Sequence, residues 1–167
     1  MYQVGEKIIY GNSGACVIED VALLRFGRTR EQYYVLRPLY QNTSVIYVPV
    51  ENADLVSRIR AIPSVEDVNA MIQEMPDTEP IWVEDAQERK AAFEEMLRSG
   101  DTRVRIRLIR SLYTYKQKRL SQGKALHVSD ENVLREAQRL LYDEFATPLN
   151  LQPSQVPAYI EAQLAEK

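Results

Sequence analysis

The stretch QVGEKIIYGNSGACVIEDVALLRFGRTREQYYVLRPLYQNTSVIYVPV, residues 3–50, decides the fold of the first part of the chain. It is rich in Val, Ile and Tyr, which favour β-strands. Residues that suit tight hairpin turns recur along it at Gly11, Gly14, Gly27 and Asn42. The pattern predicts strands near 3–10, 15–24, 30–38 and 43–49, and a fifth near 56–61. Because short strands in an open sheet leave unpaired edges, we expect them to close into a small β-barrel.

From residue 63 the hydrophobic periodicity becomes helical. Ser64 followed by Asp67 resembles a capping box, and Gly100 suits the end of a second helix. Helices are predicted over 63–75, over 83–100, from Thr102 onward, over 129–151, and in a short segment after Ser154. In the fourth, Ser129 is the expected N-cap and Pro148 the expected end. The sequence therefore predicts an α+β fold, with a β-barrel domain over 1–62 and an all-α helical domain over 63–167.

The segment DTRVRIRLIRSLYTYKQKRLSQGKALHVS, residues 101–129, is strongly basic in a chain whose net charge is −3. After its opening Asp it contains no acid and eight bases: Arg103, Arg105, Arg107, Arg110, Lys116, Lys118, Arg119 and Lys124. Helical geometry places four of them within about 80° of one face: Arg103, Arg107, Arg110 and Lys118. Leu108 and Leu112 fall on the side that faces the core. A solvated helix face is one interpretation, and a phosphate-binding face, which would relieve the self-repulsion, is the other.

Several classes of function have little support in the sequence. The chain contains one histidine, His127, and one cysteine, Cys16, so we expect no zinc site, no Cys-His catalytic pair and no intramolecular disulfide. It contains no apolar run long enough to span a membrane, and its start does not resemble a secretion signal. We therefore expect a cytoplasmic protein that is not an enzyme, requires no cofactor and is a monomer.

The single tryptophan, Trp82, lies where a proline-flanked connector becomes a helix. One interpretation is a core anchor that fills the gap between the connector and the helices. The other is an exposed wedge, since some DNA-binding proteins insert apolar side chains between base steps.

The segments VGEKIIYGNSGACVIEDV, YYVLRPL and VPVENAD, followed by LRSGD and a basic helix, resemble the CarD (CdnL) family of bacterial transcription factors. The resemblance extends along most of the chain, and GKALHVSDENVLREAQRLLYDEFA is similar to Firmicutes-type members. It implies a Tudor-like N-terminal domain that binds the β subunit of RNA polymerase. It also implies a helical domain that contacts promoter DNA near the upstream edge of the −10 region and stabilises the open complex without a catalytic step.

The resemblance and the charge pattern together give the candidate residues. The candidate DNA contacts are Trp82, Arg89, Lys90, Arg103, Arg107, Arg110, Lys118 and Lys124. The candidate polymerase contacts are Arg25, Tyr34, Leu36, Ile46, Tyr47 and Pro49, on the expectation that polymerase adds a strand to the edge formed by QYYVLRPL or TSVIYVPV.

Two positions depart from the family pattern. The tryptophan of better-known members corresponds to Ala86 when counted back from Gly100, whereas Trp82 lies about one helical turn earlier. The polymerase-binding arginines of some members fall near Leu24 and Tyr47, which indicates a more apolar contact here.

Three hypotheses of different classes follow from these observations. The first is a promoter factor bound to polymerase, the second a free-standing nucleic-acid-binding protein, and the third an adaptor whose basic face binds an acidic protein.

Overall fold

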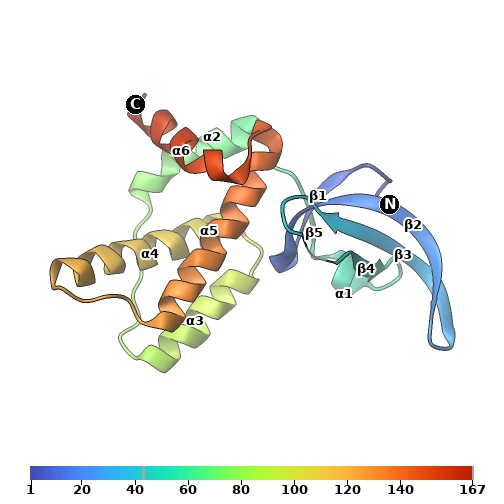
Figure 1. The fold of residues 1–167 in the computed structure, drawn as a ribbon, viewed down its shortest axis with the longest axis horizontal. Helices are drawn as coiled ribbons and strands as arrows, with labels where there is room; N and C mark the ends of the chain where they lie inside the picture. Colours follow the sequence, from blue (N-terminus) through green and yellow to red (C-terminus); the bar gives the residue numbers. More distant parts are fainter. Residues whose placement is uncertain (43, 167) are drawn as a thin grey trace. The chain divides into compact units, whose positions relative to one another are not determined.

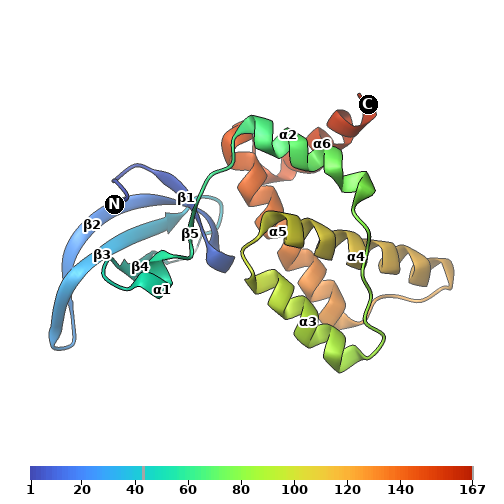
Figure 2. The same cartoon turned by 180° about the vertical axis from the view of Figure 1, so that it is seen from behind.

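The computed structural model describes residues 1–42 and 44–166, apart from the side chain of Asn12. It divides into two compact units, Met1–Pro63 and Ser64–Lys167, which we call the β unit and the helical unit (Figures 1 and 2). No helix within the described residues is long and apolar enough to cross a membrane.

The β unit contains one antiparallel sheet of five strands, in the order β4-β3-β2-β1-β5. The strands are β1 (Lys7–Tyr10), β2 (Gly14–Phe26), β3 (Thr29–Pro38), β4 (Ile46–Pro49) and β5 (Ile59–Ala61). Two short helical elements connect them, η1 (Gly11–Ser13) and α1 (Ala53–Val56). The five predicted strands are confirmed, although the predicted start of the fourth at Thr43 lies outside the described residues.

The sheet is open in the part of the chain that the structure describes. Its edges are β4, with 4 residues, and β5, with 3 residues, and no described pairing joins them. A bulge between Ile18 and Asp20 interrupts the register of β2 with β3. Beyond it the two strands continue as a long hairpin (Figure 1). Closure into a Tudor-like barrel is therefore not confirmed and stays a prediction.

The strand alternation decides which side chains form the core of the β unit. Tyr34 and Leu36 on β3 point to one face and are 2% and 0% exposed. They pack in one apolar cluster with Ile8, Cys16, Ile18, Val48 and Ile59. Because successive residues alternate, Tyr33 and Val35 lie on the opposite face of the sheet.

The helical unit contains five α-helices and two 3₁₀ turns within its described residues. They are α2 (Val65–Glu74), η2 (Met75–Asp77), α3 (Ala86–Arg98), α4 (Thr102–Ser121), α5 (Val128–Leu149), η3 (Pro153–Gln155) and α6 (Val156–Ala165). The Ser64 hydroxyl accepts a hydrogen bond from the Asp67 backbone N–H at 3.0 Å, so Ser64 is the N-cap of α2, which confirms this half of the predicted capping box. Gly100, with φ of 74°, separates α3 from α4, as predicted.

Both predicted ends of α5 are wrong by one or two residues. The helix begins at Val128, so Ser129 lies in its first turn and is not the N-cap. The N-cap is His127, and Asp130 in the first turn accepts hydrogen bonds from Arg89 of α3. Pro148 lies inside the last turn, where a missing N–H removes only one hydrogen bond, and Asn150 ends the helix in a left-handed conformation with φ of 56°.

The core of the helical unit joins α3, α4 and α5. Phe93, Leu108, Leu112 and Leu134 are at most 2% exposed and belong to one cluster. Leu141 and Phe145 are buried farther along α5. The prediction that Leu108 and Leu112 face the core is therefore confirmed. Most of the bases of α4 lie on the side of the helix that faces solvent.

Candidate functional site

The basic helix α4 finds acidic partners on neighbouring elements. Arg103 pairs with Glu74 of α2 at 2.9 Å, and Lys116 pairs with Glu131 of α5 at 3.0 Å. Arg105 points inward and is 1% exposed, with its Nη1 3.7 Å from Glu144 Oε1. The expectation that this helix accepts unrelieved self-repulsion is therefore only partly correct, since the carboxylates that neutralise it come from α2 and α5.

The Arg103–Glu74 pair lies on the surface. The hydrogen bonds from Arg103 lower the pKa of the Glu74 carboxyl and raise the pKa of Arg103. A carboxyl with a lowered folded-state pKa stabilises the fold above its unfolded pKa, and the effect disappears as the pH falls through the lowered value. The side chains are 63% and 52% exposed, so solvent screening keeps the contribution small.

Five other bases on and near the predicted face form no ion pair with a carboxylate among the residues that the structure describes. Arg107, Arg110 and Lys118 on α4 are exposed, as are Lys124 after α4 and Lys90 on α3. Arg107 and Arg110 bind only backbone carbonyl groups, of Glu79, Thr78 and Pro76, within the described residues. They form the centre of a basic surface that could bind a polyanion.

Tyr113 is an exposed aromatic residue beside this surface that was not among the predicted site residues. Its side chain is 53% exposed on α4, and helical geometry places it about 60° from Arg110. This helical phase was visible in the sequence and could have identified the residue. An exposed aromatic ring beside arginines can contact bases or sugars of a nucleic acid.

Arg89 is buried, although the sequence predicted a DNA contact. It is 4% exposed, and its guanidinium binds the Asp130 carboxylate through Nε at 3.2 Å and Nη2 at 3.0 Å. Its Nη1 donates to the carbonyl groups of Val83 and Glu84 at 2.9 and 3.2 Å. The side chain thus ties the connector, α3 and α5 together, and we exclude it from the candidate DNA surface because its donors are already engaged.

Trp82 packs within the helical unit. Its ring stacks on Tyr115 with centroids 3.6 Å apart and contacts the edge of Phe93 at 5.8 Å. The Arg89 guanidinium lies 4.4 Å from the ring centroid. This geometry favours the core anchor over the exposed wedge, because an inserting side chain would first have to leave three aromatic and cationic contacts.

The predicted polymerase contacts of the β unit divide into buried and accessible residues. Tyr34 and Leu36 point into the core, so their side chains are not available to a partner. Their strand β3 lies between β2 and β4, and residues 33–36 of QYYVLRPL pair with both neighbours, so this segment is not an edge strand. The other candidate segment, TSVIYVPV, contains the edge strand β4, where Tyr47 is 45% exposed and Ile46 and Pro49 are half-buried. Arg25 is exposed near the tip of the hairpin.

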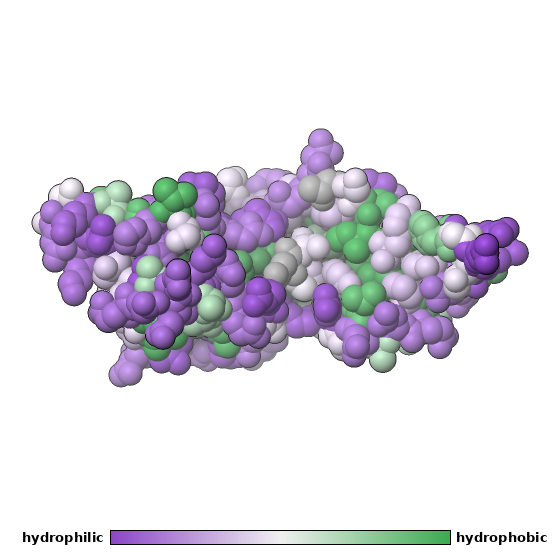
Figure 3. Space-filling model, turned by 90° about the horizontal axis from the view of Figure 1, so that it is seen from below, coloured by the Kyte–Doolittle hydropathy of each residue, from purple (hydrophilic) through white to green (hydrophobic). Residues whose placement is uncertain are grey.

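Aromatic rings extend from the β4 edge across the sheet face opposite the core. Tyr47 contacts Phe26 at 5.4 Å and Tyr33 at 6.4 Å between ring centroids, in edge-to-face arrangements. Phe26 is 49% exposed, so this aromatic patch is accessible. The space-filling view shows apolar surface among the hydrophilic side chains of the β unit (Figure 3). Phe26 was not predicted as a site residue, because its ring contacts depend on strand register.

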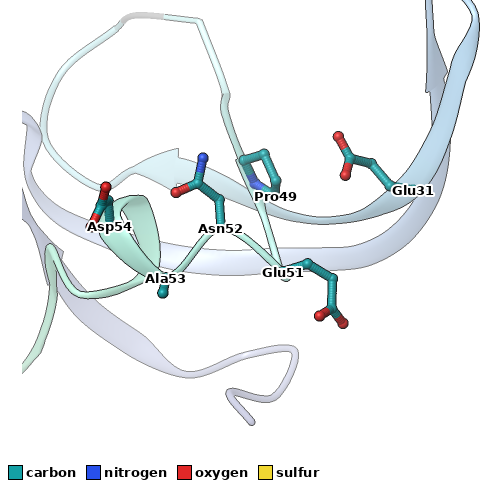
Figure 4. A pocket seen from close by; sticks show the side chains of 6 residues that line it. All are labelled: Glu31, Pro49, Glu51, Asn52, Ala53 and Asp54. Carbon is teal, nitrogen blue, oxygen red and sulfur yellow. The ribbon is translucent and has the colours of Figure 1, made fainter.

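An open acidic hollow lies next to this patch (Figure 4). It has a volume of about 450 Å³ and is lined by Glu31, Pro49, Glu51, Asn52, Ala53 and Asp54. Glu31 also accepts a hydrogen bond from the Tyr33 hydroxyl at 2.9 Å, which raises the pKa of that phenol. No group of three His, Cys, Asp or Glu side chains in the described part of the chain could hold a metal ion.

The β unit matches a known domain family. Residues 2–60 match the model described as the CarD-like/TRCF RID domain. The β unit is thus similar to a CarD-like/TRCF RID domain. The match covers nearly all of the unit and ends before the helical unit begins. The open β4 edge, Tyr47 and the aromatic patch therefore lie within the matched residues, whereas the basic surface does not.

A second comparison extends along the whole chain. Over 159 residues the chain is 23% identical to "Putative transcription factor YdeB" of Bacillus subtilis (strain 168). The alignment covers 95% of this chain and 99% of that protein, so it includes the β unit and the helical unit together. The match over residues 2–60 confirms the resemblance to the CarD family that the sequence predicted, and the second comparison is with a protein named as a putative transcription factor.

Proposed function

We propose that this protein is a transcription regulator that binds the β subunit of RNA polymerase through its RID domain. Its helical unit would contact promoter DNA near the upstream edge of the −10 region and stabilise the open complex. The observation that carries the proposal is the match of residues 2–60 to a CarD-like/TRCF RID domain, because the CarD resemblance implies a polymerase-binding role. We further propose that it acts in the cytoplasm as a monomer, with no cofactor and no catalytic step.

The β4 edge is the proposed polymerase-docking site. An added strand gains backbone hydrogen bonds along an open edge and side-chain contacts on alternate positions. Tyr47 and Phe26 offer such apolar contacts on one face. We propose that the β unit has a Tudor-like architecture in which β4 remains available to a strand of the partner.

The exposed face of α4 is the proposed DNA contact. Arg107, Arg110 and Lys118 would bind phosphates, with Lys124, Lys90 and Tyr113 at the margins of the surface. Neither contact needs to be strong, since linking two weak sites raises the local concentration of DNA once polymerase is bound. Stabilising the open complex by about 1.4 kcal/mol changes the ratio of open to closed complex tenfold.

The lifetime of the open complex on a promoter tests this proposal. The lifetime of the open complex is measured after addition of a competitor. We expect it to be several-fold longer when polymerase is saturated with the protein than when the protein is absent. The double variant R107A/R110A is expected to lose most of that increase while remaining bound to polymerase. R98A is the matched control, because Arg98 pairs with Glu95 on α3, outside the basic surface.

An unchanged lifetime with polymerase-bound protein would contradict the proposal. Salt-sensitive DNA binding without any polymerase binding would favour a free-standing nucleic-acid-binding protein instead. If the protein binds polymerase but R107A/R110A leaves the lifetime of the open complex unchanged, the result would favour an adaptor whose basic surface binds an acidic protein.

A further inference from the structure

The connector between α2 and α3 lies against α4, and its backbone binds two arginines of the basic surface. Arg107 Nε donates to the Glu79 carbonyl at 3.0 Å, and Arg110 Nε donates to the Thr78 carbonyl at 2.8 Å. Arg110 Nη2 also lies 3.5 Å from the Pro76 carbonyl. Figure 2 shows the connector crossing α4 on its way to α3. Two arginines three residues apart on one helix are therefore held by carbonyl groups of two consecutive residues.

Ser111 fixes the connector at this place. Its hydroxyl accepts a hydrogen bond from the Ile81 backbone N–H at 2.9 Å and donates one to the Arg107 carbonyl at 2.7 Å. Ser111 is 2% exposed, so these bonds are shielded from water. The next residue of the connector, Trp82, stacks on Tyr115 of the same helix. The connector thus has a defined register along α4 and is not a loose loop.

The charges of Arg107 and Arg110 are not neutralised by these bonds. A carbonyl group is neutral, whereas Arg103, Arg105 and Lys116 of the same helix are paired with carboxylates. The connector carboxylates of Asp77 and Glu79 are exposed, and neither forms an ion pair with the two arginines within residues 1–42 and 44–166. Both guanidinium groups also keep unused donors on their terminal nitrogens, because a guanidinium carries five N–H bonds.

We propose that the connector and α4 form a preorganised phosphate clamp. The carbonyl groups of Thr78 and Glu79 orient Arg110 and Arg107 through Nε, and the terminal nitrogens then bind the oxygens of one phosphodiester or of two adjacent ones in duplex DNA. This inference rests on the proposed DNA contact of α4 and assigns Ser111 as a positioning residue. Orienting the side chains before binding reduces the entropy lost on binding, and planar guanidinium groups suit phosphate better than ammonium groups do.

Charge-conserving substitutions separate orientation from charge. We expect R107K/R110K to keep the slope of log affinity against log salt for a duplex, because two positive charges remain, yet to bind roughly tenfold more weakly. R107A/R110A is expected to bind more weakly still and to reduce that slope by about 2. S111A changes no charge but loosens the connector, so it is expected to bind roughly threefold more weakly. Anisotropy of a labelled duplex at low salt measures all three.

The matched control is R98K, an arginine-to-lysine change at an exposed position of α3. It should leave the affinity for the duplex unchanged. Melting curves identify any variant that fails to fold, and S111A keeps the test valid if the double lysine variant does so. If R107K/R110K binds as tightly as the wild type, or if R98K weakens binding equally, the clamp is refuted while the DNA contact stands. Tighter binding by S111A would show that the connector masks the arginines, which also refutes the clamp. If the wild type shows no salt-sensitive binding, the proposed DNA contact fails together with the clamp.

Discussion

Replacing Arg89 by methionine is expected to destabilise the helical unit by about 3–5 kcal/mol, because removing one partner of a buried ion pair leaves the other charge uncompensated. The Arg89 and Asp130 side chains are 5% and 4% exposed, so water cannot replace the lost partner of Asp130. The substitution also removes the hydrogen bonds to the Val83 and Glu84 carbonyl groups and the contact with Trp82. Urea unfolding followed by helical circular dichroism measures the effect.

The neighbouring residue supplies the control. Lys90 is exposed and has the same charge and nearly the same length, so K90M is expected to change the free energy of unfolding by no more than about 0.5 kcal/mol. If R89M is as stable as K90M, the buried role of Arg89 is contradicted. Loss of DNA affinity by R89M at unchanged stability would restore Arg89 to the DNA surface.

Replacing Trp82 by alanine is expected to destabilise the helical unit by about 2–4 kcal/mol. The estimate lies slightly below the range for fully buried tryptophans because the side chain is only half-buried. The loss comes from the stacking on Tyr115, the edge contact with Phe93 and the packing of Arg89. W82F is expected to recover more than half of the lost stability, because a phenyl ring can still stack on Tyr115.

A wedge role for Trp82 gives the opposite pattern. W82A would then keep the melting temperature of the wild type and shorten the lifetime of the open complex. Y113A provides the comparison. Because Tyr113 is exposed beside Arg110, this substitution should reduce DNA binding without loss of stability. The pair of variants thus identifies which aromatic ring of the helical unit meets DNA.

The strands were predictable because their signal is local. Val, Ile and Tyr between glycine-rich turns recur at strand length, and the five strands follow this pattern. The order of the strands and the face of each side chain depend on register, which the sequence does not show directly. For this reason Tyr34 and Leu36 were predicted as partner contacts, although they lie in the core. The exposed ring of Phe26 was missed for the same reason.

The helical unit shows a similar limit for charged residues. The phase of α4 correctly predicted that Leu108 and Leu112 are buried and that Arg107, Arg110 and Lys118 are exposed. The phase could not show which bases have partners, because Glu74, Glu131 and Glu144 come from other helices, α2 and α5. Burial of Arg89 likewise depends on Asp130, which is 41 residues away. Tertiary partners of charged side chains were therefore the main part of the site that the sequence could not predict.

Retention of the full chain on immobilised core RNA polymerase, without DNA and at controlled salt, tests the central claim most directly. We expect the wild type to be retained and Y47D to be lost, because the substitution places a charge on the exposed face of the β4 edge. V4D is the matched control, since Val4 is an exposed apolar residue of the same unit, outside the sheet strands. Retention of the wild type and V4D but not of Y47D is the predicted result. Failure of the wild type to bind polymerase would contradict the account.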